Sequence, residues 1–144
     1  MTIEALRQKF TNKLPGKAAQ DRMSPQPKFV EGKKGIHQGL PINSAVMLLL
    51  IPHQGDLAIP FIKRTNVGKY HGGQIALPGG KTEPGDGNSL HTALRECEEE
   101  IGVTSKEVTV IGKLSDVYIP LSNFNITPFV GTIPEMPNFV LSKN

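Results

Sequence analysis

The sequence has one cysteine, no tryptophan and no long apolar run. A single cysteine excludes a disulfide bond within the chain, and with it the small secreted scaffolds that depend on several such bonds. The longest apolar run, residues 45–51, has about a third of the length that a membrane-spanning helix needs. The N-terminus also lacks the apolar segment of a signal peptide. We therefore expect a cytoplasmic protein that does not cross a membrane.

The chain also carries little excess charge of either sign. Its 16 Lys and Arg and 13 Asp and Glu give a net charge of +3. With six Phe and two Tyr, it has no basic stripe interleaved with aromatic side chains of the kind that binds single-stranded nucleic acid. We expect a small anionic ligand and no nucleic-acid partner.

The chain divides into a short N-terminal segment and a main domain. Its 144 residues are enough for one domain with a hydrophobic core. Residues 2–12 have the apolar spacing of a short helix, with Thr2 as its N-cap. Residues 13–43 contain four prolines and four glycines, which predict irregular structure. We place the N-terminal segment at residues 1–42 and the main domain at residues 43–144.

A β-hairpin is predicted at the start of the main domain. Residues 44–52 form a continuous apolar run closed by proline, which is typical of a strand buried on both faces. A turn signal at residues 53–56 precedes a second strand-like stretch, residues 57–64. Residues 74–78 resemble a further strand, after which Gly79 and Gly80 leave it.

Two more strands are predicted near the C-terminus. Residues 107–119 alternate well enough for a strand, with Gly112 as a candidate bulge. Residues 125–133 form another, which we expect on an edge or interrupted because Pro128 lacks a backbone donor. Strands around one strongly predicted helix indicate an α+β or α/β/α architecture.

That helix lies between Asn88 or Ser89, either of which is a plausible N-cap, and Gly102, which suits a left-handed C-cap. At about 100° per residue, its apolar face is narrow. This face consists of Leu90, Leu94, Cys97 and Ile101. We expect it to bury the helix, with Cys97 as an inert small residue rather than a nucleophile.

The same helix carries glutamates that crowd one another. Like charges four residues apart destabilise a helix, so a positive partner is expected. On a helical wheel, Glu96, Glu99 and Glu100 cluster opposite the apolar face, within about a third of the circumference. Arg95 and Glu98 lie outside this cluster. Carboxylates are the hard oxygen ligands that Mg²⁺ or Mn²⁺ prefers. A solvated acidic face is the alternative, but the glycine pair and loop before the helix favour a metal and phosphate site.

The segment from Gly80 to Val103 resembles the signature of the Nudix family, Gly-x5-Glu-x7-Arg-Glu-U-x-Glu-Glu-x-Gly-U, where U is apolar. Residues 95–103, "RECEEEIGV", match its second half at every fixed position. The first half departs from the signature. Asp86 stands where a glutamate is expected, and eight residues instead of seven separate it from Arg95.

An aspartate with one extra residue before "TALRE" resembles the coenzyme A pyrophosphatase branch of this family. That branch has a second pattern upstream, Leu-Leu-Thr-x-Arg-Ser-x3-Arg-x3-Gly-x-Val-x-Phe-Pro-Gly-Gly. The sequence matches this pattern outright at Arg64, Gly73, Pro78, Gly79 and Gly80. Conservative replacements stand at Thr65, Lys69, Ile75 and Leu77, while residues 60–62 hardly fit.

The resemblance implies a Nudix-like α/β/α sandwich around a mixed sheet and hydrolysis of a diphosphate linkage with Mg²⁺ or Mn²⁺. The substrate would be coenzyme A or a derivative, cleaved to 3',5'-ADP and 4'-phosphopantetheine products. Glu96, Glu99 and Glu100 would hold the metal, and Arg95 would orient them by a salt bridge. The residues expected to contact the substrate are Arg64, Lys69, Gly73, Gly79 and Gly80.

Two other functions stay open. One is a Nudix hydrolase of another nucleoside diphosphate derivative or a dinucleotide, which the poor match at residues 60–62 would favour. The other is a non-catalytic nucleotide-sensing module, a class that typically loses its metal carboxylates. The presence of Glu96, Glu99 and Glu100 argues against this second alternative.

The C-terminal end predicts an incomplete sandwich. In a Nudix fold a second helix normally follows the last strands and covers the other face of the sheet. Residues 104–144 read as strands without such a helix, and an apolar face of this size is rarely left exposed. We therefore expect a fragment of a longer protein, a homodimer, or a sheet covered by the N-terminal helix around Leu6 and Phe10.

Overall fold

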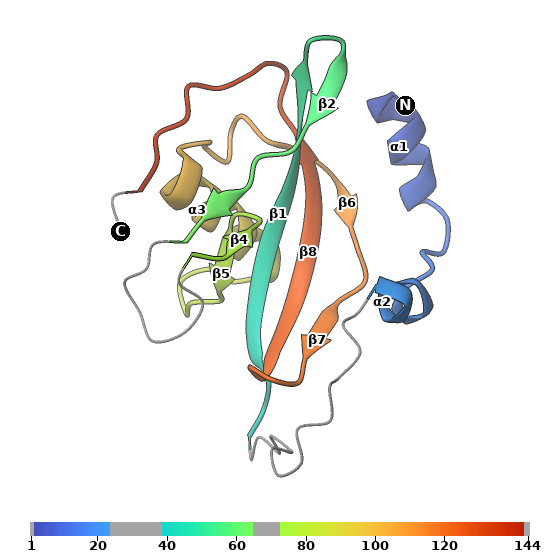
Figure 1. The fold of residues 1–144 in the computed structure, drawn as a ribbon, viewed down its shortest axis with the longest axis vertical. Coiled ribbons are helices and arrows are strands. Elements are labelled where there is room, and N and C mark those ends of the chain that lie inside the picture. The colour runs from blue at the N-terminus through green and yellow to red at the C-terminus, as the bar shows by residue number, and fades with distance from the viewer. Residues whose placement is uncertain (1, 24–38, 65–72, 143–144) are drawn as a thin grey trace.

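The computed structural model describes residues 2–23, 39–64 and 73–142, which fold as α+β (Figure 1). Helices and strands occur in the order α1 (Ile3–Phe10), α2 (Lys17–Met23), β1 (Ile42–His53), β2 (Asp56–Ala58), β3 (Ile62–Lys63), β4 (Ile75–Ala76), β5 (Gly79–Lys81), α3 (Ser89–Ile101), β6 (Thr109–Lys113), β7 (Val117–Ile119) and β8 (Phe124–Thr132).

A mixed sheet forms the centre of the molecule. Its middle is the parallel pair β1 and β8, in register from Ile42 opposite Phe124 to Leu50 opposite Thr132. Antiparallel to β1 run β2 and β5, and antiparallel to β8 run β6 and β7. Strands β3 and β4 pair with each other as a separate ribbon. The predicted hairpin is confirmed, because β2 returns along β1 with Ala58 opposite Ile51.

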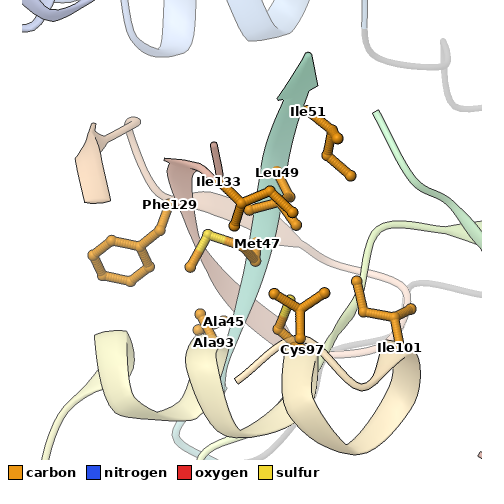
Figure 2. Packing of buried hydrophobic residues seen from close by; sticks show 10 residues of the cluster. Ala45, Met47, Leu49, Ile51, Ala93, Cys97, Ile101, Phe129 and Ile133 are labelled. Carbon is orange, nitrogen blue, oxygen red and sulfur yellow. The ribbon is translucent and has the colours of Figure 1, made fainter. Parts of the chain in front are cut away.

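Helix α3 covers one face of the sheet and encloses the core (Figure 2). Alternate residues of β1 point at it, since successive side chains of a strand face opposite sides. The fully or almost fully buried cluster comprises Ala45, Met47, Leu49, Ile51, Ala93, Cys97, Ile101, Val103, Phe129 and Ile133. Leu90 and Leu94 pack only partly against it. The predicted apolar face is therefore correct for Cys97 and Ile101, but its centre is shifted towards Ala93.

Helix α1 lies on the opposite face of the sheet (Figure 1). The predicted cap is confirmed, because Thr2 Oγ1 accepts a hydrogen bond from the Ala5 N–H at 3.2 Å. The ring of Phe10 packs where a Cβ of Gly112 would be, and the register of β6 against β8 shifts beside Gly112, which confirms the predicted bulge. The N-terminal helix thus covers part of the open face. The homodimer and the longer chain stay predictions.

Residues 13–43 are not wholly irregular, so that prediction was wrong in part. Helix α2 forms because its sequence, "KAAQDRM", contains good helix formers between Gly16 and the prolines further on. A tertiary contact supports it, since Gln20 Nε2 donates to Ser115 O at 2.9 Å. Strand β1 also begins at Ile42, earlier than predicted.

The stretch from residue 57 to residue 64 is also not one strand. It divides at Pro60 into β2, which pairs with β1, and β3, which pairs with β4. Proline has no N–H to donate to a ladder, so the chain can leave the first sheet there. The glycine pair behaves differently from the prediction as well. Gly79 and Gly80 belong to strand β5 itself.

The placement of Pro128 on an edge or interrupted strand was wrong. Strand β8 is continuous and central, with neighbours on both sides. The Pro128 carbonyl accepts from the Leu114 N–H at 2.9 Å, in the gap between β6 and β7. In an antiparallel ladder, the N–H and the C=O of a residue point to the same neighbouring strand. The N–H that Pro128 lacks would therefore point into the gap between β6 and β7. The predicted interruption therefore lies between β6 and β7, the strands that pair with β8, and not in β8 itself.

The segment after β8, residues 133–142, returns to the C-terminal end of α3. The Val140 N–H donates to Ile101 O at 3.1 Å, and the Ser142 N–H donates to Glu100 O at 3.4 Å. Carbonyls at the end of a helix have no partner within it, so these bonds satisfy two of them. Gly102 ends the helix with φ of 75°, as the sequence predicted.

Replacing Gly102 by alanine should measure this contact. Gly55 has a similar φ of 82° but open space around it, whereas a Cβ on Gly102 would lie 2.8 Å from Val140 Cβ. We expect Gly55→Ala to lower the free energy of unfolding by about 1–2 kcal/mol, the cost of a left-handed backbone. Gly102→Ala should cost clearly more in urea unfolding. Equal losses would show that residues 133–142 contribute nothing to the end of α3.

Candidate functional site

The site begins with the contact between α3 and strand β5. Asn88 Oδ1 caps the helix by accepting from the His91 N–H at 3.0 Å. Packing of Cys97 and Ile101 on the core then turns the Glu96 and Glu100 side of the helix towards β5. The wheel placed these glutamates opposite the apolar face, but the structure shows both half-buried.

The two glycines of β5 make this close contact with α3 feasible. The Gly79 N–H donates to Glu100 Oε2 at 2.9 Å, and a Cβ on Gly80 would overlap the Glu96 carboxylate. On Gly79 a Cβ would instead overlap the Ala45 backbone oxygen. Close packing therefore explains why both positions are glycine, while their contact with a substrate stays a prediction.

Arg95 uses all five of its N–H donors, and it is the positive partner that the sequence called for. Its Nε and Nη2 donate to Asp86 Oδ1 and Oδ2 at 2.8 and 3.1 Å. Nη2 also donates to Lys81 O at 3.0 Å. Nη1 donates to Glu96 Oε1 and Glu99 Oε2, both at 3.1 Å. The salt bridge expected between Arg95 and the glutamates is thus present for Glu96 and Glu99.

Asp86 is the residue that sequence reasoning missed, since it had been given no role. It is only 5% exposed, and its Oδ2 also accepts from the Glu83 N–H at 2.9 Å. The hydrogen bonds from Arg95, together with that of Glu83, hold the pKa of Asp86 well below its usual range. Asp86 in turn raises the pKa of Arg95. The available signal was its position after Gly80, where the family signature has an acid.

Burial changes the proton affinity of the neighbouring acids in the other direction. Desolvation raises the pKa of Glu96, an effect that the charge of Arg95 partly offsets. Desolvation also raises the pKa of Glu100, against the hydrogen bond from Gly79. Burial, with the charge of Glu100, raises the pKa of Cys97 to about 12. A fully buried thiol of that kind is not a nucleophile, as expected from the sequence.

The three glutamates do not form a ready-made metal cage. Within residues 2–23, 39–64 and 73–142, no group of three or more His, Cys, Asp or Glu side chains is placed to hold a metal ion. Arg95 stands between Glu96 and Glu99, and Glu100 turns to Gly79. The Glu99 side chain is 58% exposed. Assignment of a metal to these three residues therefore stays a prediction.

Arg64, the residue that follows strand β3, contacts strand β5 at the same site. Its Nη2 donates to Gly79 O at 3.4 Å, and its charge offsets a small part of the rise that desolvation causes in the pKa of Glu100. Two backbone hydrogen bonds of 2.9 Å join Arg64 to Gly73 and to Gln74. The structure thus brings together Arg64, Gly79 and Gly80, with Gly73 beside Arg64. Lys69 lies outside the described residues.

In the described part of the chain, no helix is both long and apolar enough to cross a membrane. Fold and site together define an α+β domain in which a glutamate-rich helix is held against a two-glycine strand. The model of the NUDIX domain family matches residues 41–129, and the chain belongs to this family.

A curated relative has only a general name. The chain is 36% identical over 95 residues to an "Uncharacterized Nudix hydrolase NudL" of Yersinia enterocolitica. The match covers 66% of this chain and 48% of the relative, so that the chain spans about half the length of the curated relatives it matches. The relative's name supports the family and leaves the substrate open.

Solved structures share the fold at low sequence identity. A Caenorhabditis elegans Ap4A hydrolase in a binary complex has a TM-score of 0.59 at 16% identity, with 69% of this chain and 71% of that chain covered. The NUDIX domain of Shewanella oneidensis NrtR, complexed with ADP ribose, has a TM-score of 0.56 at 16% identity, with 88% and 76% covered. These likenesses confirm the predicted Nudix-like sandwich as the fold.

The ion pair of Asp86 should make stability depend on pH. Because the folded-state pKa of Asp86 is lowered, its contribution is complete above its unfolded pKa of about 3.9 and is lost as the pH falls through the folded value. We expect Asp86→Asn to be less stable than the wild type at pH 7, with the difference narrowing below about pH 4. Urea unfolding between pH 3 and pH 7 measures this.

Asp56→Asn, at the exposed first residue of β2, is the control and should shift stability little. If the loss caused by Asp86→Asn were the same at pH 3 and pH 7, the charge of Asp86 would not contribute to folding.

Proposed function

We propose that this domain hydrolyses a diphosphate linkage in a small nucleotide-type substrate with the help of Mg²⁺ or Mn²⁺, and that the substrate is coenzyme A or a derivative. One observation carries the general reaction. In a member of the NUDIX family, a single arginine holds Glu96 and Glu99 on a helix whose Glu100 faces the glycine strand.

The donor chemistry of the glutamates fits a divalent cation. Arg95 occupies one oxygen each of Glu96 and Glu99, and Gly79 occupies one oxygen of Glu100. Half-buried carboxylates with raised pKa at Glu96 and Glu100 also gain from a nearby positive charge. Three carboxylates on one helix present the hard oxygen donors that suit Mg²⁺ or Mn²⁺.

A bound divalent cation would neutralise the charge of the phosphoryl oxygens and lower the pKa of a water molecule. The residues of the chain would do the rest. Arg95 keeps Glu96 and Glu99 oriented, and the Gly79 N–H keeps Glu100 oriented. Arg64, beside Gly79, can pair with a phosphate oxygen. Water then adds across the P–O–P bridge, and two phosphomonoesters leave.

The sequence pattern supports coenzyme A as the substrate. Asp86 precedes "TALRE" with one extra residue, and the upstream pattern matches at Arg64, Gly73 and the glycine pair. Asp86, the residue at which the sequence departs from the signature, is the buried ion-pair partner of Arg95, which supports a role for it in the site. A dinucleotide or an ADP-ribose-like substrate is the second candidate, because folds like this one occur in an Ap4A hydrolase and in a domain complexed with ADP ribose.

A substrate panel tests the proposal. The protein is incubated with coenzyme A, NADH, ADP-ribose and a dinucleoside polyphosphate, each with Mg²⁺ or Mn²⁺, and the products are separated by chromatography. We expect 3',5'-ADP and 4'-phosphopantetheine from coenzyme A. Cleavage of another compound with coenzyme A untouched would leave only the general reaction. Thermal stabilisation by a ligand without turnover of any would favour the sensing module.

Glutamine variants test the assigned carboxylates. Glu99→Gln and Glu100→Gln keep size and remove charge, so kcat should fall about 100-fold or more, because several kcal/mol of transition-state stabilisation are lost. Glu98→Gln, on an exposed neighbour, is the matched control and should keep nearly full activity. Melting temperatures show that each variant is folded. Equal losses at Glu98 and Glu99 would contradict the assignment, and wild-type activity of both cluster variants would exclude the metal site.

A further inference from the structure

We propose that Thr92 is a positioning residue for the glutamate helix. Its hydroxyl orients the carboxylate of Asp86, which holds Arg95 and, through Arg95, Glu96 and Glu99. The inference rests on the proposed diphosphate hydrolysis, and it adds a residue that lies outside the fixed positions of the family signature.

The hydroxyl of Thr92 belongs to a directed chain of hydrogen bonds. Thr92 is completely buried, and its Oγ1 donates to Asp86 Oδ2 at 2.8 Å. Thr82 Oγ1 lies 3.2 Å from Thr92 Oγ1. A hydroxyl has one hydrogen, and the ionised carboxylate is the stronger acceptor. Thr92 therefore gives its hydrogen to Asp86 rather than to Thr82 Oγ1 or to Asn88 O, which lies 3.4 Å away.

This chain determines how Asp86 faces Arg95. Asp86 Oδ2 accepts from Thr92, from the Glu83 N–H at 2.9 Å and from Arg95 Nη2 at 3.1 Å, while Oδ1 accepts from Arg95 Nε at 2.8 Å. The first two donors thus fix the position of Oδ2 independently of Arg95. Both oxygens then meet the Nε and Nη2 edge of Arg95, which leaves Nη1 for the glutamates.

Core packing alone does not explain a threonine here. Thr92 lies one turn before Arg95 and Glu96, so that its side chain sits on the same side of α3. Threonine is a weaker helix former than alanine, and a buried hydroxyl costs free energy unless it is hydrogen-bonded. Valine has nearly the same shape without the hydroxyl, so Thr92→Val removes the bond to Asp86 together with the weaker contacts to Thr82 Oγ1 and to Asn88 O.

The experiment compares Thr92→Val with Thr92→Ser. The valine variant removes the hydroxyl at constant shape, and the serine variant keeps it. Thr127→Val is the control, because Thr127 is a buried threonine of β8 outside this network. Two readouts are taken for each folded variant. One is kcat and KM with the compound that the wild type cleaves, and the other is Mn²⁺ binding to the protein without substrate, followed by electron paramagnetic resonance.

We expect Thr92→Val to lower kcat and to weaken Mn²⁺ binding by about 10-fold each, with KM within about twofold, as is typical of residues behind metal ligands. Thr92→Ser should restore both, and Thr127→Val should change neither. If Glu99→Gln abolishes turnover while Thr92→Val behaves as the wild type, the role of Thr92 is overturned and the proposed function stands. Equal losses in the valine and serine variants also overturn it.

If the wild type neither cleaves any compound of the panel nor binds Mn²⁺, the proposed function fails and the role of Thr92 fails with it. If the wild type binds Mn²⁺ without turnover, the binding measurement alone decides. Weaker binding in the valine variant with recovery in the serine variant supports the role of Thr92, and unchanged binding in both refutes it.

Discussion

The site depends on how closely the backbone of strand β5 approaches helix α3. Gly79 and Gly80 have no Cβ, and a Cβ at either would overlap the Ala45 backbone or the Glu96 carboxylate. The contact lets a backbone N–H reach Glu100 and places two acids in a half-buried position where water is scarce. A side chain at position 80 would separate β5 from the helix, and one at position 79 would separate it from β1.

Half-buried carboxylates are costly, and Arg95 offsets that cost. Its guanidinium gives one edge to Asp86 and the remaining nitrogen to Glu96 and Glu99. Asp86 is nearly inaccessible to solvent, whereas Glu99 is mostly exposed. The network thus runs from a buried anchor to a solvent-facing acid. An arrangement that raises the pKa of two acids on one helix face is unfavourable for stability, which is typical of functional sites.

Local signals predicted the elements whose partners are close in sequence. The caps at Thr2 and Asn88, the left-handed Gly102 and the hairpin from β1 to β2 depend on backbone groups a few residues away, and all are present. Predictions failed where contacts with distant parts of the chain determine the structure. Helix α2 was missed because the prolines that follow it dominated the prediction for residues 13–43. Pro128 was misplaced because the gap between β6 and β7 is visible only once both strands are paired with β8.

The sequence by itself determined the helix, its glutamates, the glycine pair and the family to which they belong, because these are properties of residue type and spacing. Only the tertiary structure decided which atoms meet. Asp86 is nine residues before Arg95 and meets it where the loop before α3 folds back on the helix. Gly79 is twenty-one residues before Glu100 and meets it only when β5 packs beside α3 on β1. Burial then decided the acid strengths. Spacing along a helix states which side chains share a face, but desolvation by a neighbouring strand is a property of the folded chain.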